Sequence, residues 1–358
     1  MTLSRNANLR EVGKPKIIAS GIGSGGHYFP AVVTAVELLR RRCDVFFLVR
    51  KGFQEEKIAR RYGLKTFLVN SRPFFGKSIF GKIFFAFILL HSIFRLHALT
   101  RGGIGLAFGG FGAVPLNISC LLNRSPFYVF EPNRVPGRAT RFFARSARRV
   151  FLGLPPVASL HGKISITGIP IRREFKVDRR PAGFGRQTGK VRVLVYGGSQ
   201  GARFLNDMAL ALQDIIPGKW YLTIISGIRD YARVISSKKV RTHVIPFSET
   251  PWEEIRRSDI LVSRAGALAG YEILALGKKV VFVPFPHAID DHQYHNALYF
   301  TEIGDALLRA EKELTPKDLA KCLRELMKRK RWRQTSLILD AEKKIADLML
   351  KDIENEKT

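Results

Sequence analysis

The stretch KIIASGIGSGGHYFPAVVTAVELLRRR, residues 16–42, combines three signals of one fold. The apolar run at 16–20 is typical of a buried strand, a glycine-rich loop follows it, and an apolar helical pattern comes next. A strand, a glycine turn and a helix in this order open a Rossmann-like unit. The stretch therefore predicts a parallel sheet with a ligand loop at the carboxyl end of its first strand.

The glycines of 21–26 also satisfy G-x-G-x-x-G, the pattern of dinucleotide sites. A dinucleotide site needs an acidic residue at the end of the second strand to bind ribose hydroxyls. The predicted second strand, 44–50, ends at Arg50, and Asp44 lies at its opposite end. Arg50 could suit NADP, but no later motif supplies a hydride-transfer site. The sequence therefore favours another anionic ligand over a nicotinamide.

Apolar, β-branched runs alternate with helical patterns along the rest of the chain, which predicts the α/β class with parallel sheets. A polar stretch at 172–190, with Gly and Pro and no apolar period, is interpreted as a linker between two series of strands. Charged helical segments are expected at about 315–329 and 332–353. The predicted strands are 16–20, 44–50, 66–70, 104–110, 127–131 and 149–153 in the first series, and 191–198, 220–227, 242–247, 259–263 and 279–286 in the second.

The second series also begins with a strand and a glycine-rich loop, GGSQGA at 197–202. Glycines let a ligand approach the backbone, and a helix that starts near Gly201 presents its free N–H groups and positive dipole end to an anion. Ser199 and Gln200 add side-chain hydrogen bonds. The loop predicts a diphosphate cradle, with a tight turn that binds nothing as the alternative. Two such halves facing one another would line one cleft.

A third motif spans residues 263–297 and suits a ligand with several hydroxyl groups. Small residues at 265–267 allow close approach to a ligand. Glu272 could hold two vicinal hydroxyls, or it could be an exposed helix residue. The loop at 290–296 is dense in donors and acceptors suited to sugar hydroxyls. Its Asp and His spacing matches no standard metal site.

The chain is strongly basic, with 60 Lys and Arg against 30 Asp and Glu and a net charge of +30. This excess requires an anionic partner such as nucleic acid, a membrane surface or phosphorylated substrates. The three cysteines are scattered, so neither a disulfide framework nor a zinc site is expected, and a reducing compartment is favoured. No signal-peptide pattern is apparent in residues 1–14.

Residues 73–99 depart from the soluble pattern, with seven phenylalanines and only basic charges. The longest charge-free run, 83–94, has 12 residues, fewer than the ~20 needed to span a bilayer. The segment is either a buried core helix or a helix or hairpin in the membrane interface. The net charge favours the interface, and a membrane suits this mixture better than nucleic acid. The expected docking residues are Phe74, Phe75, Lys77, Phe80, Lys82, Phe84, Phe85, Phe87, Phe94 and Arg95.

Three motifs together resemble the MurG family: GIGSGGHYFPA at 21–31, GGSQGA at 197–202, and SRAGAL with VPFPHAIDDHQYHNA within 263–297. The resemblance covers residues 16 to about 330. It implies a GT-B architecture, two Rossmann-like domains with parallel sheets facing a central cleft. The implied parts are an acceptor and membrane-docking domain at 1–171, a donor domain at 172–335, and a helix at 336–358 that packs back on the first domain.

The resemblance also implies an activity in peptidoglycan synthesis, and hence in cell-wall biogenesis, cell shape and division. The family transfers GlcNAc from UDP-GlcNAc, with inversion, to the muramyl 4-hydroxyl of the undecaprenyl-linked lipid I, giving lipid II. Its members are peripheral proteins at the cytoplasmic face of the inner membrane. The expected partners are thus UDP-GlcNAc, lipid I and an anionic membrane surface, without nucleic acid. No cofactor is expected to be required, although a divalent cation could stimulate.

Matching positions imply a set of site residues. The resemblance places Glu272 at the ribose, Ala267 and Leu268 at the diphosphate, and Gln293 with its neighbours at the GlcNAc hydroxyls. Phe247 and Ser248 would lie along the uracil edge. The implied donor residues are Arg172, Ser199, Gln200, Phe247, Ala267, Leu268, Glu272, His292, Gln293 and Asn296, and the implied acceptor residues are Ser24, Gly25, Gly26 and Asn133.

His27 is the candidate general base for the acceptor hydroxyl, since its ordinary pKa suits neutral pH. A structural histidine bonded to backbone is the alternative, and Glu131 is another candidate base. The sequence departs from the family pattern in the first loop, 21–27, where Ser24 keeps a hydroxyl, and at Pro132, Thr140 and Ile169. All of these positions are on the acceptor side or the hinge. The motifs therefore identify the donor substrate better than the acceptor substrate.

Three other functions remain open from the sequence. A related GT-B transferase could use another lipid acceptor such as a diacylglycerol. A non-enzymatic basic membrane or nucleic-acid binder could keep a degenerate transferase scaffold, although it would gain nothing from the polar loop at 290–296. A soluble UDP-sugar epimerase could share the fold, but the segment 73–99 would then be a liability.

Overall fold

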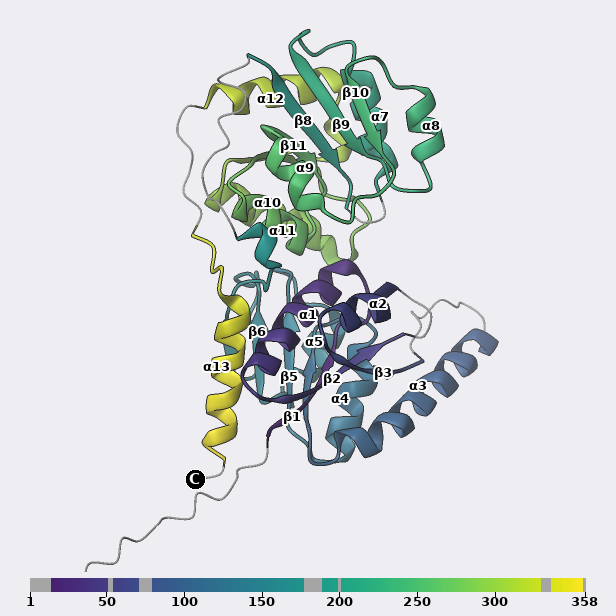
Figure 1. Ribbon diagram of the computed structural model, residues 1–358, viewed down its shortest axis with the longest axis vertical. Coiled ribbons are helices and arrows are strands. Elements are labelled where there is room, and N and C mark those ends of the chain that lie inside the picture. Colours follow the sequence, from purple (N-terminus) through teal and green to yellow (C-terminus); the bar gives the residue numbers. More distant parts are fainter. Residues whose placement is uncertain are drawn as a thin grey trace, which may run out of the picture.

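The computed structural model describes residues 14–50, 54–70, 79–176, 189–198, 201–329 and 336–356. Two α/β units stack along the long axis of the molecule, each with its own parallel sheet (Figure 1). The last helix, α13 (Ala341–Glu354), lies alongside the first unit. The chain therefore crosses between the two units twice.

The first sheet has seven parallel strands in the order β3-β2-β1-β4-β5-β6-β7. Ile17 and Ile18 in β1 point to opposite faces and neither is exposed, because helices cover both faces of the sheet. The strands are β1 (Lys16–Ser20), β2 (Asp44–Val49), β3 (Lys65–Leu68), β4 (Ile104–Ala107), β5 (Phe127–Glu131), β6 (Arg149–Leu152) and β7 (Ile164–Ile166). The helices are α1 (Gly25–Arg40), α2 (Gln54–Arg61), α3 (Ile79–Thr100), α4 (Ala113–Leu122) and α5 (Arg138–Phe143).

The second sheet has six parallel strands in the order β10-β9-β8-β11-β12-β13. The strands are β8 (Val191–Tyr196), β9 (Trp220–Ile225), β10 (Thr242–Ile245), β11 (Ile260–Ser263), β12 (Lys279–Phe282) and β13 (Ala306–Leu308). The helices are α7 (Arg203–Leu212), α8 (Tyr231–Ser236), α9 (Pro251–Arg257), α10 (Ala267–Ala275), α11 (His292–Ile303) and α12 (Pro316–Lys328), with short 3₁₀ turns at Arg173–Phe175, Ile289–Asp291 and Glu311–Glu313.

Both sheets reverse their strand order beside the first strand, between β1 and β4 and between β8 and β11. Ligands of open α/β sheets bind in the crevice outside the carboxyl ends of the strands at such a point. The loops that follow these four strands are therefore placed to form a site. The predicted α/β class with two parallel sheets is confirmed.

Gly21 explains why the first loop begins with glycine. A Cβ on this residue would lie 2.5 Å from the Cβ of Ala31, inside any allowed contact. The absence of a side chain lets α1 pack directly against the end of β1, which fixes the direction in which the helix leaves the loop.

The strand predictions differ from the structure mainly at the loops. The predicted strand 104–110 ends at Ala107, because Gly109 and Gly110 adopt positive φ angles of 59° and 70° and form a turn. Two short strands, β7 and β13, were not predicted, since three residues give too little periodicity. The predicted last helix, 332–353, begins later, at Ala341.

The predicted linker, 172–190, lies between the last strand of the first sheet and the first strand of the second, and its first residues are buried. Arg172 is 8% exposed and Phe175 is fully buried, so this end of the segment packs into the protein instead of crossing solvent. Phe175 contacts Trp252 of α9 edge to face, with ring centroids 5.9 Å apart. A single buried aromatic in a polar run leaves no periodic signal.

Helix α13 is bound to the first unit by apolar and ionic contacts. Ile345 and Met349 are fully buried in a core shared with α1. Asp352 is 4% exposed, and its two oxygens accept from Nη2 and Nε of Arg149 at 2.7 and 2.9 Å. Buried charges persist when they are paired and hydrogen-bonded in this way.

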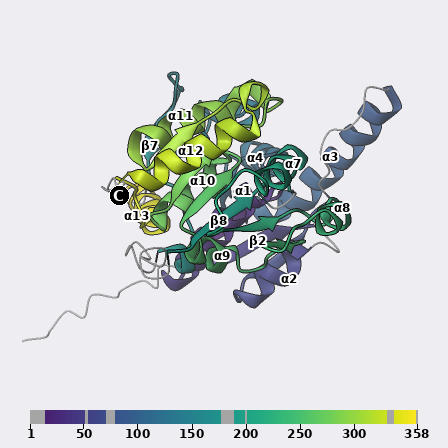
Figure 2. The same ribbon diagram turned by 90° about the horizontal axis from the view of Figure 1, so that it is seen from above.

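Helix α3 projects beyond the rest of the first unit, with the end at Ile79 free of other elements in both views (Figures 1 and 2). One face packs inward: Leu96 and Thr100 are fully buried, and the Thr100 hydroxyl lies 2.8 Å from the Ser119 hydroxyl. The opposite face is exposed, with Phe87 at 67% and Phe94 at 80%. The core-helix alternative for this segment is therefore wrong.

Among the described residues, α3 is the helix with the length and composition to cross a membrane. The membrane interface remains a prediction for this helix. Of the expected docking residues, Lys82, Phe84, Phe85, Phe87, Phe94 and Arg95 lie on α3, Phe80 lies in its first turn, and Phe74, Phe75 and Lys77 fall outside the described residues.

Candidate active site

A cavity of about 800 Å³ lies between the carboxyl ends of the two sheets. It is lined by the starts of α1, α7 and α10 and by the loops around Asn133 and His292. Most of the predicted site residues meet here although they are distant in sequence. Those that line the cavity are Ser24, Gly25, Gly26, His27, Asn133, Arg172, Ala267, Leu268, Glu272, His292 and Gln293.

His27 sits in a cradle of glycine backbone. A Cβ on Gly109 would lie 3.0 Å from its Cε1 atom, and a Cβ on Gly110 would lie 3.4 Å from its Cδ2 atom. The loops after β1 and β4 thus close around the imidazole at the point where the strand order reverses. The sequence predicts a strand end at Gly109 and Gly110, but these residues form a turn. Their positive φ angles bring the turn around the imidazole.

Burial lowers the pKa of His27, and the negative charge of Glu131 opposes this only in part. No hydrogen bond of normal geometry reaches its buried Nδ1 atom. The imidazole is therefore neutral at pH 7, the form that can accept a proton. A backbone contact with Phe108 also raises the pKa of His27 in part, so the alternative of a structural histidine stays a prediction beside that of the base.

Glu131 has a structural function, and the prediction that it could act as the base is wrong. It is 2% exposed, and its Oε1 atom accepts from the backbone and side-chain nitrogens of Asn133 at 3.1 and 3.0 Å. Its Oε2 atom accepts from the Gly137 N–H at 2.9 Å and the Thr140 hydroxyl at 2.8 Å. Four donors leave this carboxylate with no free position for a substrate proton.

The same contacts explain one departure from the family pattern. Thr140 donates its hydroxyl to Glu131 and so helps to hold the loop at 131–140. The loop presents Pro132 and Asn133 to the cavity. Asn133 is therefore positioned by Glu131 through two hydrogen bonds.

Arg172 and Glu272 form a buried pair in the centre of the cleft, with Nη2 3.4 Å from Oε1. Burial raises the pKa of Glu272 to about 7, and the charge of Arg172 only partly offsets it. The guanidinium carbon of Arg172 lies 4.2 Å from the ring centroid of Phe29 and 4.9 Å from that of Trp252. The exposed-helix alternative for Glu272 is wrong, because this carboxyl group is 3% exposed and lines the cavity.

The starts of α7 and α10, like that of α1, line the cavity without a side-chain cap. Ala267 and Leu268 have buried side chains, so α10 offers the cavity its backbone. Unpaired N–H groups at a helix start, together with the helix dipole, bind anions. Both helix starts therefore suit a diphosphate. Ser199 and Gln200 fall outside the described residues.

The loop before α11 contributes His292 and Gln293 to the cavity. Nδ1 of His292 lies 2.9 Å from the Ile289 carbonyl oxygen, which orients the imidazole. Oε1 of Gln293 accepts from the Phe285 N–H at 3.0 Å, which leaves the amide NH₂ group to donate. Both side chains are thus oriented for hydrogen bonds to a ligand.

Asn296 has protein partners in place of a sugar, contrary to the prediction. It is fully buried, and its amide nitrogen donates to Oδ1 of Asn133 at 3.0 Å and to the Ala265 carbonyl oxygen at 3.2 Å. Its oxygen accepts from the Arg134 N–H at 3.0 Å. The side chain therefore joins the two units. Asn296 and Gln293 belong to the same short motif, and a motif does not show which side of a helix faces the cleft.

A second cavity, of about 790 Å³, shares Phe29, Arg172 and Tyr196 with the first. Phe247 and Ser248 line this second cavity and not the first. Helix α2 forms its opposite wall. Phe247 is 38% exposed, and Arg172 lines both its cavity and the cavity of His27.

Several cavity residues were not predicted, of which Arg264 and Glu311 form the most specific contact. Nη1 of Arg264 donates to the Val283 and Pro284 carbonyl oxygens, each at 3.1 Å, and to the carboxylate of Glu311. Arg264 belongs to the SRAGAL motif, which was the available signal, whereas Glu311 lies in a segment without a motif. The other unpredicted lining residues include Phe29, Tyr196, Arg203, Phe204 and Phe285.

Within the described residues, no group of three or more His, Cys, Asp or Glu side chains could hold a metal ion. The three cysteines are free, buried and separate from the cavity.

Two Rossmann-like units that face one cleft, with uncapped helix starts on one side and a half-buried histidine on the other, form the predicted GT-B architecture. Residues 17–152 match the glycosyltransferase family 28 N-terminal domain, and residues 192–349 match the glycosyltransferase family 28 C-terminal domain. The chain belongs to glycosyltransferase family 28 and, within it, to the MurG family.

The relatives share most of their length with this chain. A Coxiella burnetii protein (strain RSA 331 / Henzerling II) is 32% identical over 316 residues, covering 85% of this chain and 87% of that protein. Its name is UDP-N-acetylglucosamine–N-acetylmuramyl-(pentapeptide) pyrophosphoryl-undecaprenol N-acetylglucosamine transferase. A Sulfurihydrogenibium relative of the same name is 28% identical and covers 95% of this chain and 99% of that protein. The crystal structure of MurG from Acinetobacter baumannii, 23% identical, matches the fold with a TM-score of 0.75 over 94% of this chain and 99% of that one.

Proposed function

We propose that this protein transfers N-acetylglucosamine from UDP-GlcNAc to the muramyl 4-hydroxyl of undecaprenyl-diphosphoryl-MurNAc-pentapeptide, with inversion at the transferred carbon. The observation that carries the proposal is the single cleft in which the motifs of both halves meet. The names of relatives that span nearly the whole chain support the substrates.

The donor lies across Arg172 in this proposal. Its uracil occupies the cavity beside Phe247, Glu272 receives the ribose hydroxyls, and the starts of α7 and α10 receive the diphosphate. GlcNAc then extends toward Gln293, whose amide NH₂ group can donate to a sugar hydroxyl, and toward His292, whose Nε2 atom can accept from one. Arg172 has to leave Glu272 for this, and its Nε atom, which has no partner among the described residues, is available to the ligand.

His27 acts as the general base. As the acceptor oxygen attacks C1 of GlcNAc, the bond from C1 to the UDP oxygen breaks and the hydroxyl proton passes to the neutral imidazole. The lowered pKa of His27 keeps the imidazole unprotonated before the reaction. Ser24, Gly25 and Gly26 precede it at the start of α1, where backbone N–H groups suit the acceptor diphosphate.

The departing UDP is stabilised by protein groups. The two helix starts supply N–H groups and dipoles, and Arg172, Arg203 and Arg264 line the same cavity. We therefore propose that the reaction needs no metal ion, with a divalent cation acting at most as a stimulant.

Helix α3 docks the enzyme on the membrane that carries the acceptor, at the cytoplasmic face. Its exposed apolar side chains would enter the acyl boundary while Lys82 and Arg95 meet anionic headgroups. The inward face of α3 is held by Leu96 and Thr100, which favours docking over spanning. The docked helix belongs to the same unit as His27, so the lipid-linked acceptor reaches the cleft from this side.

The proposal is tested by incubating purified protein in detergent with labelled UDP-GlcNAc and a lipid I analogue. We expect label in the disaccharide lipid, both in EDTA and in magnesium. A diacylglycerol acceptor and UDP-galactose and UDP-glucose donors serve as parallel arms. Tight binding of UDP-GlcNAc without transfer to lipid I, or transfer to the diacylglycerol alone, would contradict the acceptor assignment.

A further inference from the structure

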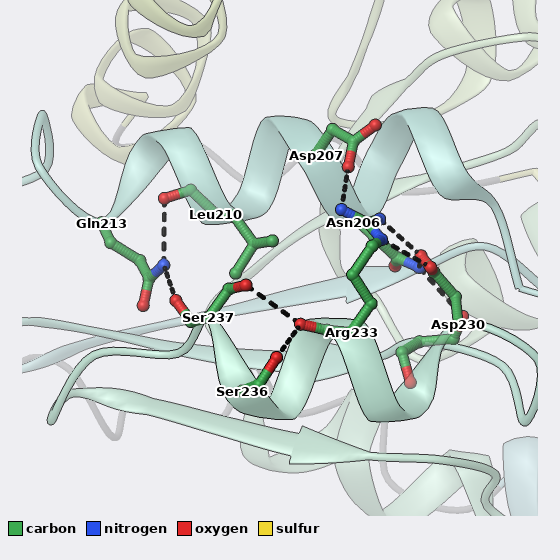
Figure 3. Close-up of polar contacts among 9 residues, drawn as sticks. Asn206, Asp207, Leu210, Gln213, Asp230, Arg233, Ser236 and Ser237 are labelled. Carbon is green, nitrogen blue, oxygen red and sulfur yellow. Dashed lines mark hydrogen bonds and ion pairs between the residues drawn. The ribbon is translucent and has the colours of Figure 1, made fainter.

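A polar cluster outside the cleft joins α7 to the turn that precedes α8 (Figure 3). Arg233 donates to Asp230 through two nitrogens, Nε to Oδ1 and Nη2 to Oδ2, each at 2.7 Å. Its third nitrogen, Nη1, lies 2.7 Å from Oδ1 of Asp207 on α7. A bidentate pair of this kind has one fixed geometry.

Asn206 connects this pair to the backbone. It is 1% exposed, and its amide nitrogen donates to Oδ2 of Asp230 at 2.7 Å and to the Ser226 carbonyl oxygen at 3.0 Å. Asp230 therefore orients the amide that holds the turn at 226–227. The hydrogen bonds to Arg233 lower the pKa of Asp230, so it remains charged at neutral pH.

The turn at 226–227 is in direct contact with the glycine-rich loop of the cleft. Gly201 has a φ of 75°, and a Cβ on it would lie 2.3 Å from the Ser226 carbonyl oxygen and 2.9 Å from Cα of Gly227. On the other side, the Ser226 N–H donates to the Ile245 carbonyl oxygen at 3.0 Å. The turn is thus a fixed wall behind Gly201.

Gly201 and Ala202 line the cavity with the start of α7. Asn206 lies in the first turns of the same helix. The cluster therefore fixes both the helix that points at the cavity and the wall behind the loop, although none of its side chains lines the cavity.

We propose that Asp230 and Arg233 are positioning residues for the donor: acting through Asn206, they hold Gly201 and the start of α7 in the geometry that binds the diphosphate of UDP-GlcNAc. This inference rests on the donor site of the proposed function and extends it to residues outside the cleft. Backbone N–H groups that are held in the binding geometry bind a ligand more tightly than mobile ones. Removing the residues that hold them therefore weakens binding, even though every N–H group is still present.

The test compares Asp230→Ala and Arg233→Gln with the wild-type full-length protein. Arg233 is about one third exposed, so its replacement leaves the core intact. For each variant we expect KM for UDP-GlcNAc and Kd for UDP to rise about tenfold, with kcat and KM for lipid I unchanged. The double variant should be no worse than Asp230→Ala, because both residues act through one contact.

Gln213 provides the matched control at the opposite ends of the same helices. Its amide nitrogen donates to the Ser237 carbonyl oxygen at 3.4 Å (Figure 3). Its oxygen accepts from the Thr242 hydroxyl at 2.8 Å. Gln213→Ala should lower the melting temperature and leave KM for UDP-GlcNAc unchanged.

An unchanged Kd for UDP in Asp230→Ala, or an equal rise in Gln213→Ala, would overturn the inference and leave the cluster with a purely structural function. Binding of UDP is measured without an acceptor. It therefore reports on this inference even if transfer to lipid I fails and the proposed function falls.

Discussion

Nη2 of Arg172 lies 3.4 Å from the carboxylate of Glu272, and both side chains are less than one tenth exposed. The pair separates the cavity that holds His27 from the cavity beside Phe247. Arg172 is surrounded by the rings of Phe29, Phe175 and Trp252 within 5.0 Å of its guanidinium carbon. A charged pair thus occupies the place where a donor would have to cross.

We expect donor affinity to increase as the pH rises through neutrality. Burial raises the pKa of Glu272 from its usual 4.5 to about 7, so the group is largely protonated at pH 6 and ionised at pH 8. The ionised form accepts hydrogen bonds from both ribose hydroxyls, and the protonated form keeps less accepting capacity. Calorimetric titration with UDP-GlcNAc between pH 6 and 8 measures the change, since the phosphates of this diester do not titrate there.

Two variants of Glu272 sharpen this prediction. Glu272→Gln should remove the pH dependence, and Glu272→Ala should weaken donor binding about 10- to 100-fold. The raised pKa of Glu272 also affects stability, because the folded protein keeps a proton that the unfolded chain loses near pH 4.5. The contribution of Glu272 to the free energy of unfolding therefore falls as the pH rises from about 4.5 to 7. A pH dependence that persists in Glu272→Gln would assign it to another group.

Replacement of His27 should affect turnover and spare donor binding. His27→Gln removes the proton acceptor, and we expect kcat to fall about 100- to 10,000-fold with Kd for UDP unchanged. Because burial lowers the pKa of His27, the wild-type kcat at saturating UDP-GlcNAc should rise with pH below 6.5 and be level at pH 7. Steady-state rates across pH 5–8 provide the measurement.

An exposed histidine on β10, His243, serves as the control. His243→Gln should behave as wild type. If His27→Gln retained full kcat, or if it lost turnover only through weaker UDP binding, the assignment of the base would be wrong.

Adding one methyl group to Gly109 tests whether the glycine cradle positions His27. Gly109→Ala would place a Cβ 3.0 Å from the imidazole and also strain a backbone with φ of 59°. We expect kcat to fall while Kd for UDP remains that of the wild type. Gly102→Ala is the matched control, because its φ is 65° and its Cβ would meet nothing within 4 Å.

Both alanine variants should lose about 1–2 kcal/mol of folding free energy from the left-handed backbone. Chemical denaturation gives this quantity for each. Equal losses of stability with a loss of turnover only in Gly109→Ala would identify the contact with His27. Equal turnover in the two variants would show that the cradle does not position the base.

Membrane binding should depend on the exposed face of α3. Phe87 and Phe94 together would bury two large rings in the acyl boundary, each worth about 1.5–3 kcal/mol. The double variant Phe87→Glu/Phe94→Glu should reduce binding to phosphatidylglycerol vesicles by at least about 100-fold in a sedimentation assay. Its transfer to a short-chain, water-soluble lipid I analogue should be unchanged.

Ile228→Glu controls for the loss of any exposed apolar side chain, since Ile228 is 74% exposed in the other unit. It should bind vesicles as the wild type does. Equal binding by the α3 double variant would place the docking surface elsewhere.

The sequence determined the class of fold and most of the chemistry on its own. Strand, glycine loop and helix recur at 16–42 and again from 191, and the buried β1 and β8 follow from their local apolar runs. These signals are local, because periodicity and turn chemistry involve residues within a few positions of each other. The site residues in motifs, such as His27, Glu272 and Gln293, were identified for the same reason.

Only the tertiary structure decided which of these residues share a cleft and in what state. The cradle of His27 needs Gly109, 82 positions away, and the raised pKa of Glu272 needs burial against Arg172. Asn296 and Glu131 carried the right chemistry for a ligand but use it on protein partners. Hydrogen-bond partners, burial and electrostatics depend on packing between segments far apart in the chain, and no local pattern contains them.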